Sequence, residues 1–144
     1  MSLSNTANER RENKLSKVID ARTHGVIDCM QAAFFLGAAW FCRKSNRRGA
    51  LAAGIAGAFI LTESLLTDYP IGAFKRVSYE GHGRMDAVLA ASFAMIPELF
   101  GFEGTGISKV FEASAFVEAS VVGMTDWGSQ SRQAEEKRPF ALAS

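Results

Sequence analysis

THGVID, at Thr23–Asp28, and its near copy GHGRMD, at Gly81–Asp86, set the architecture of this chain. Each stretch places a histidine and an aspartate four residues apart at the start of a long apolar segment. Residues four apart are neighbours on one face of a helix, about 5–6 Å from each other. The two stretches therefore predict two helices that carry the same polar pair near one end.

Four apolar runs of similar length follow one another along the chain: Gly25–Phe41, Gly49–Leu66, Met85–Phe102 and Ile107–Met124. They are rich in Ala, Leu, Phe and Met, and they lack the alternation of a half-buried strand, which predicts four helices. A helix that crosses a bilayer needs about 20 mostly apolar residues, with about 17 as the lower limit. The four runs just reach that length.

The placement of charge favours a membrane over a soluble bundle. Most charged residues that interrupt the runs lie within about a turn of a run's end, where a long side chain can reach the interface. The second run is almost uniformly apolar, and Ala50, Gly54 and Ala58 form a small-residue face that would let helices pack closely in lipid. A soluble amphipathic helix would show a polar stripe there. A helix wholly buried in a soluble bundle is the alternative.

Polar segments flank the apolar part of the chain. We expect a membrane domain over residues 21–128 between polar tails at 1–20 and 129–144. Sixteen Lys and Arg against fifteen Asp and Glu give a formal charge of +1, so no nucleic-acid partner is indicated. Lys and Arg are commoner on the side of the two tails, which predicts cytoplasmic termini. The basic residues within Arg43–Arg48 oppose that orientation.

An internal repeat relates the two halves. A shift of 58 residues aligns 21–70 with 79–128 without a gap, so that His24 falls on His82 and Asp28 on Asp86. Two helices per unit predict two tandem helical hairpins, which would insert in the same orientation around a pseudo-two-fold axis. The resulting all-α four-helix membrane bundle would carry eight polar side chains at one end: His24, Asp28, Thr67, Asp68, His82, Asp86, Thr125 and Asp126.

Three hypotheses for this polar cluster follow from its chemistry. Buried polar groups need partners, so the preferred hypothesis is structural: the histidines donate to the aspartates and staple the helices together. A metal or small ligand is the second hypothesis, because imidazole suits Zn or Fe and carboxylates suit harder ions, although the Glu-x-x-His pattern of di-iron bundles is absent. Bis-imidazole haem is a weaker variant, since both histidines are expected at the bundle rim. No cofactor is favoured.

Two further acids, Glu63 and Glu118, are expected deepest in the bundle. They break the repeat, because the shift aligns them with Val121 and Ile60. Intramembrane carboxylates are candidates for proton or solute movement, but four helices leave little room for an alternating-access pathway. No phosphate-binding loop, Cys-x-x-Cys, zinc-protease or serine-nucleophile motif indicates an enzyme. Four aromatic residues near helix ends are interpreted as interfacial anchors: Trp40, Tyr69, Tyr79 and Trp127.

The chain resembles the bacterial SPW-repeat membrane proteins in three segments: HGVIDCMQAAFFLGAAWF at His24–Phe41, SLLTDYPIG at Ser64–Gly72, and VSYEGHGRMDAVLAASFAMIPELFGF at Val77–Phe102. The resemblance extends over about residues 20–128. Of the Ser-Pro-Trp motif that names those proteins, this chain keeps Trp40 in the first copy and Pro97 in the second. The resemblance implies a small four-helix protein of the bacterial inner membrane, without a particular activity. We therefore expect a structural or accessory protein whose partners are the lipid bilayer and other membrane proteins or copies of itself.

Overall fold

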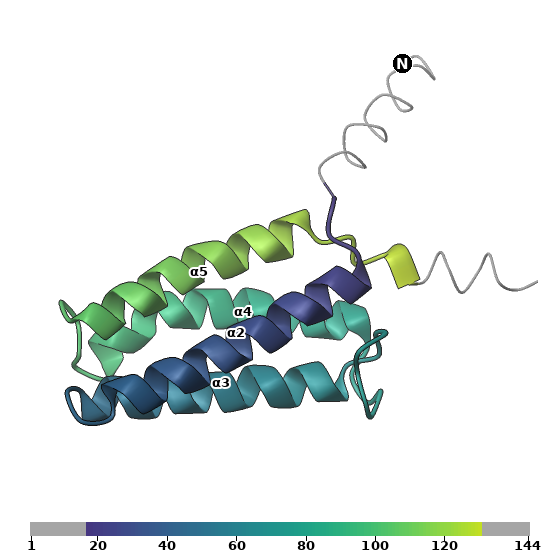
Figure 1. Cartoon of the computed structure of the whole chain (residues 1–144). Coiled ribbons are helices and arrows are strands. Elements are labelled where there is room, and N and C mark those ends of the chain that lie inside the picture. Colours follow the sequence, from purple (N-terminus) through teal and green to yellow (C-terminus); the bar gives the residue numbers. More distant parts are fainter. Residues whose placement is uncertain (1–16, 131–144) are drawn as a thin grey trace, which may run out of the picture.

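The computed structural model describes residues 17–130, which form four α-helices and no strand longer than an isolated bridge (Figure 1). The helices are α2 (Ala21–Cys42), α3 (Arg47–Leu66), α4 (Tyr79–Leu99) and α5 (Gly106–Met124). The all-α class and the four helices predicted from the apolar runs are thus confirmed. The tails predicted at 1–20 and 129–144 lie outside the described residues, apart from 17–20 and 129–130.

Each helix begins at a polar residue whose side-chain oxygen accepts a hydrogen bond from the backbone N–H three residues later. Such a cap satisfies one of the N–H groups that the first helical turn leaves unpaired. Because the capped first turns are polar, α2 and α4 begin before the apolar runs that predicted them. The four caps are Asp20, Asn46, Ser78 and Thr105.

Helix α4 ends earlier than its apolar run predicted. The run extends to Phe102, whereas α4 ends at Leu99. Gly101 takes a φ of 63°, in the left-handed region that glycine tolerates best, and the Phe102 N–H donates to the carbonyl of Pro97 at 2.9 Å. The chain turns at this point, which lets α5 return alongside α4 (Figure 1).

The four helices pack as two hairpins, α2 with α3 and α4 with α5, and the backbones approach far more extensively within a hairpin than between hairpins. Small residues explain the close approach in the first hairpin. Ala53 is fully buried, and a Cβ added at Gly57 would lie 3.0 Å from the backbone oxygen of Ala32. Between the hairpins, large side chains keep the backbones apart.

An aromatic core fills the middle of the space between the hairpins. The ring centroids of Phe35 and Phe93 lie 4.8 Å apart, and that of Phe111 lies 5.1 Å from Phe35 and 5.6 Å from Phe93. All three side chains are completely buried. Aromatic pairs at such distances contribute about 0.5–1.5 kcal/mol beyond the burial of their area.

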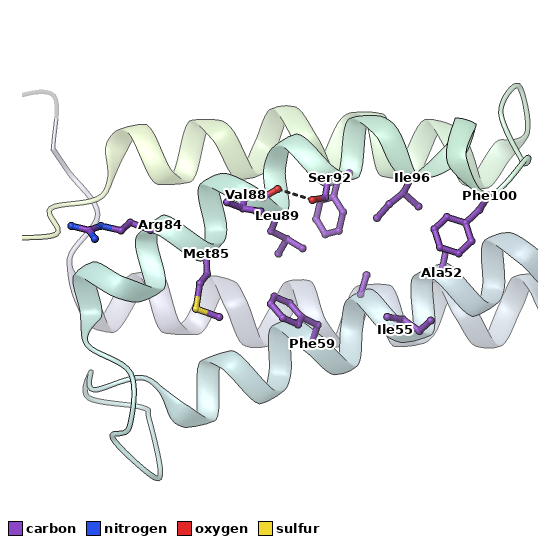
Figure 2. Close-up of a pocket in the computed structure, with 12 residues that line it drawn as sticks. Ala52, Ile55, Phe59, Arg84, Met85, Val88, Leu89, Ser92, Ile96 and Phe100 are labelled. Carbon is purple, nitrogen blue, oxygen red and sulfur yellow. Dashed lines mark hydrogen bonds between the residues drawn. The ribbon is translucent and has the colours of Figure 1, made fainter.

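Two apolar grooves run along the outside of the molecule where the hairpins meet. Figure 2 shows the groove between α3 and α4, of about 470 Å³, in which Phe59 and Ile55 face Val88 and Ile96. A second groove, of about 540 Å³, lies between α2 and α5, and its lining includes Met30, Phe34, Val110 and Val117.

Two of the four predicted membrane spans meet a test of length and hydropathy. Among the described residues, α2 and α3 are long and apolar enough to cross a bilayer. The buried core helix of a soluble protein can be equally long and apolar, so the side chains that α2 and α3 expose distinguish the two cases.

Candidate functional site

Six of the eight predicted polar side chains gather between the hairpins, near the end of the bundle where the described chain begins and ends (Figure 1). His24, Thr67 and Thr125 have no exposed surface, and His82 is 1% exposed. The histidines are the fourth residues of α2 and α4, so they lie near one end of the bundle, but they are buried there. The six residues, called the polar cluster below, are His24, Asp28, Thr67, His82, Asp86 and Thr125.

The two imidazoles meet at the centre of the polar cluster. The Nε2 atoms of His24 and His82 are 3.2 Å apart. Oδ2 of Asp86 lies 3.0 Å from Nε2 of His24 and 3.2 Å from Nε2 of His82. Asp28 contacts the same two nitrogens at 3.4 and 3.1 Å. Each histidine therefore contacts one aspartate of its own helix and one of the other hairpin.

Threonine hydroxyls hold the outer nitrogen of each imidazole. Nδ1 of His24 lies 3.0 Å from Oγ1 of Thr125, and Nδ1 of His82 lies 3.0 Å from Oγ1 of Thr67. Each hydroxyl donates its one proton to a helix carbonyl four residues back, at 2.6 and 2.7 Å. The hydroxyls can therefore only accept from the rings. We assign the Nδ1–H tautomer to both neutral imidazoles, which leaves both Nε2 lone pairs directed at the centre.

Equivalent contacts recur at a spacing of 58 residues. The ring of Tyr69 lies against Gly25, and the ring of Trp127 lies against Gly83, where a side chain would collide with either ring. The chain just before α2 also pairs with the residue after α5, in the bridge of Ile19 with Thr125, and the chain just before α4 pairs with the residue after α3, in the bridge of Val77 with Thr67.

An aromatic layer covers the polar cluster on the side of the termini. Tyr69 is 1% exposed and donates from its hydroxyl to Oδ2 of Asp28 at 3.0 Å. Burial raises the pKa of Tyr69 above its usual range, with a further contribution from Asp28, so the phenol remains a donor. The ring of Trp127 lies 4.8 Å from that of His24, and Tyr79 packs between Trp127 and Tyr69. These three residues were predicted as interfacial anchors, and only their aromatic character hinted at a role beside the cluster.

Two predicted members of the site lie elsewhere. Asp68 is exposed, and its carboxylate pairs with Lys75 at 3.1 Å. Asp126 is half-buried, and its backbone N–H donates to Ile19. Both follow a threonine with extended backbone, where successive side chains point to opposite sides. The threonine points inward, which takes the following aspartate out of the polar cluster.

The two deep acids are both buried. Glu63 is 3% exposed and places Oε1 3.3 Å from Nδ1 of His82, while Glu118 is also 3% exposed. The position equivalent to Glu63 in the other half is the buried Val121, so His24 has no such carboxylate on its outer side. This is the main departure of the site from two-fold symmetry.

The arrangement limits what the site can hold. Nε2 atoms 3.2 Å apart leave no space for a porphyrin between the rings, so the haem hypothesis does not fit. His24, His82 and Asp86 each offer a ligand atom, all within 4.8 Å of one another, to a single metal ion. Comparison with known proteins finds no matching family model, no similar curated protein and no similar solved structure.

The two threonines provide a test of this geometry. Thr125→Val leaves the Nδ1–H of His24 buried without an acceptor, which should lower the free energy of unfolding by about 1–3 kcal/mol. Thr67→Val should have a smaller effect, because Oε1 of Glu63 is already 3.3 Å from the ring nitrogen of His82. Chemical or thermal unfolding of the two variants measures the difference. Equal losses would contradict the assigned roles of Glu63 and the two hydroxyls.

Proposed function

We propose that this protein is an integral membrane protein of structural or accessory type, in which the polar cluster joins two related helical hairpins inside the bilayer. The observation that carries the proposal is that polar side chains are buried in the bundle while large apolar side chains are exposed on its surface. Among residues 17–130, ten polar or charged residues are buried, including both histidines and four carboxylates. Large apolar side chains are exposed along all four helices, including Met30, Ile55, Val88 and Phe116. In water, exposed apolar surface of this extent would be unfavourable.

Within the described residues, exposed charge is confined to the helix ends and the loops. Arg22, Arg47 and Arg84 lie in the first two turns of their helices, and Glu98 lies in the last turn of α4. The central turns expose only apolar or small neutral side chains and a few hydroxyls. A helix of 20 residues such as α3 is about 30 Å long, which matches a hydrocarbon core about 30 Å thick. The helices therefore have the length of a bilayer interior, and their central turns form an uncharged band that would lie at its middle.

The same distribution explains why α4 and α5 do not meet the hydropathy test. Asp86 and Glu118 lower the mean hydropathy of these helices, yet both carboxylates point inward and are buried. Lys109 and Glu112 are exposed, but they lie in the first two turns of α5, within reach of an interface. A membrane-facing surface depends on which residues are outside, and an average over the helix does not measure that.

The joining role of the polar cluster follows from where the hairpins touch. The backbones of different hairpins make few close approaches, so the aromatic core and the cluster supply most of the contact between them. Contacts repeated at 58 residues support two hairpins of common origin related by a pseudo-two-fold axis. The SPW-repeat resemblance supports a location in the bacterial inner membrane. Cytoplasmic termini, and a role beside other membrane proteins or copies of itself, complete the proposal.

A charge in the uncharged band distinguishes a membrane protein from a soluble bundle. Phe116 lies midway along α5 and is 77% exposed. Phe116→Arg should reduce the amount of chain that stays in membranes after an alkaline wash, because a centrally placed Arg costs about 2.5–3.5 kcal/mol on insertion. Phe116→Leu is the matched control and should behave as the wild type. Soluble wild-type chain, with an Arg variant that is at least as soluble, would overturn the membrane proposal.

A double-mutant cycle tests the joint between the hairpins. His24→Ala, Asp86→Ala and the double variant should unfold in mild detergent with a coupling free energy of about 0.5–3 kcal/mol, because the two side chains contact each other across the hairpins. The exposed pair Asp68 and Lys75 provides a control cycle that should be close to additive, since solvent screens it. Additive effects of His24→Ala and Asp86→Ala would show that the cluster does not join the hairpins.

A further inference from the structure

We infer that the centre of the polar cluster is a binding site for one divalent ion of a first-row transition metal, such as Zn²⁺. The ligand atoms are Nε2 of His24, Nε2 of His82 and Oδ2 of Asp86. The Asp28 carboxylate also contacts both Nε2 atoms. The inference goes beyond the joining role and does not depend on the membrane around the bundle, because it rests on the geometry of four buried side chains.

The first argument is the direction of the lone pairs. Because Thr67 and Thr125 accept from the Nδ1–H groups, both neutral imidazoles present an unprotonated Nε2 to the centre. Those nitrogens face each other at 3.2 Å and face carboxylate oxygens at 3.0–3.4 Å. Four groups that can only accept hydrogen bonds repel one another unless a positive charge lies between them. That charge is either a metal ion or protons added to the rings.

The second argument is distance. The three atoms from His24, His82 and Asp86 are separated by 3.2, 3.0 and 3.2 Å. Bonds of about 2.0–2.1 Å at tetrahedral angles would place ligand atoms about 3.3–3.4 Å apart. One ion can therefore bind all three atoms after shifts of a few tenths of an ångström. Protons alone do not require three groups to converge on one point.

The third argument is charge. No Lys or Arg is buried among residues 17–130, so only the imidazoles or a bound ion can neutralise Asp28 and Asp86 inside the bundle. Two positive charges from the ion balance those two carboxylates and leave the imidazoles neutral. Two imidazoles and carboxylate select Zn²⁺, Fe²⁺ and similar ions over Mg²⁺ and Ca²⁺, which take oxygen ligands.

The surrounding groups orient the ligands as expected around a metal. Each imidazole donates from its second nitrogen to a threonine, which fixes the ring, and the phenol of Tyr69 donates to Asp28. Such outer partners raise ligand basicity and hold the rings in position. The aromatic layer of Tyr69, Tyr79 and Trp127 shields this side of the site.

Zinc titration of the purified full-length protein tests the inference. The chain is stripped with a chelator in mild detergent and titrated with Zn²⁺, with Mg²⁺ as a competitor. The wild type should bind one Zn²⁺ per chain, undisturbed by Mg²⁺. Asp86→Asn, which keeps the size of the side chain, should weaken binding by more than about 100-fold. Asp68→Asn removes an exposed carboxylate at the same end and should bind as the wild type. Both variants keep Cys29 and Cys42, so binding by thiols would appear equally in each.

A measurement on the wild type alone keeps the test decisive if Asp86→Asn does not fold. X-ray absorption of the zinc-loaded protein should count two imidazoles bound to the ion. No stoichiometric Zn²⁺, a complex with fewer than two imidazoles, or equal affinity in a folded Asp86→Asn variant would overturn the site. A wild type that binds no ion, but whose His24→Ala/Asp86→Ala cycle still shows coupling, would leave the joint between the hairpins standing and remove the metal.

Discussion

The whole structure depends on the requirement that polar groups buried away from water find partners within the protein. The two histidines, the two helix aspartates and the two threonines of the polar cluster meet that requirement only when both hairpins are present. A hairpin on its own would make none of these four hydrogen bonds, because each of them joins one hairpin to the other. The cluster therefore stabilises one arrangement of the hairpins over others, because a shift of register would leave buried donors and acceptors without hydrogen-bond partners.

Contacts within and between the hairpins are of different kinds, and the difference explains the site. Small residues such as Ala53 and Gly57 let α2 and α3 approach closely, which leaves no space for a site between them. Phenylalanine rings and imidazoles separate the hairpins and create an interior wide enough for four carboxylates. Apolar side chains then occupy the outside, where the groove of Figure 2 opens between α3 and α4. The position of the polar cluster thus follows from the sizes of the residues that line each interface.

The sequence predicts much of this arrangement, and its failures have physical causes. Periodicity gave four helices, and the His-x-x-x-Asp spacing placed each pair on one helix face, as the contacts of 3.4 and 3.2 Å confirm. The direction of a side chain just after a helix depends on the backbone angles there, and spacing does not reveal them. For that reason Asp68 was expected inside and lies outside. Tyr69 was expected at an interface and covers the cluster, because its contact with Gly25 is set by the return of the chain after α3.

The central claim is that α4 and α5 face lipid despite their internal acids, and collision accessibility of spin labels measures this directly. A nitroxide attached at Val88 or Val117, both exposed, is examined in liposomes after Cys29 and Cys42 are replaced by Ala. We predict frequent collisions with oxygen, which concentrates in lipid, and few with a water-soluble nickel chelate. A label at Lys75 in the loop between α3 and α4 should show the opposite. Free access of the nickel chelate to Val88 and Val117 would contradict the account and return the protein to the class of soluble bundles.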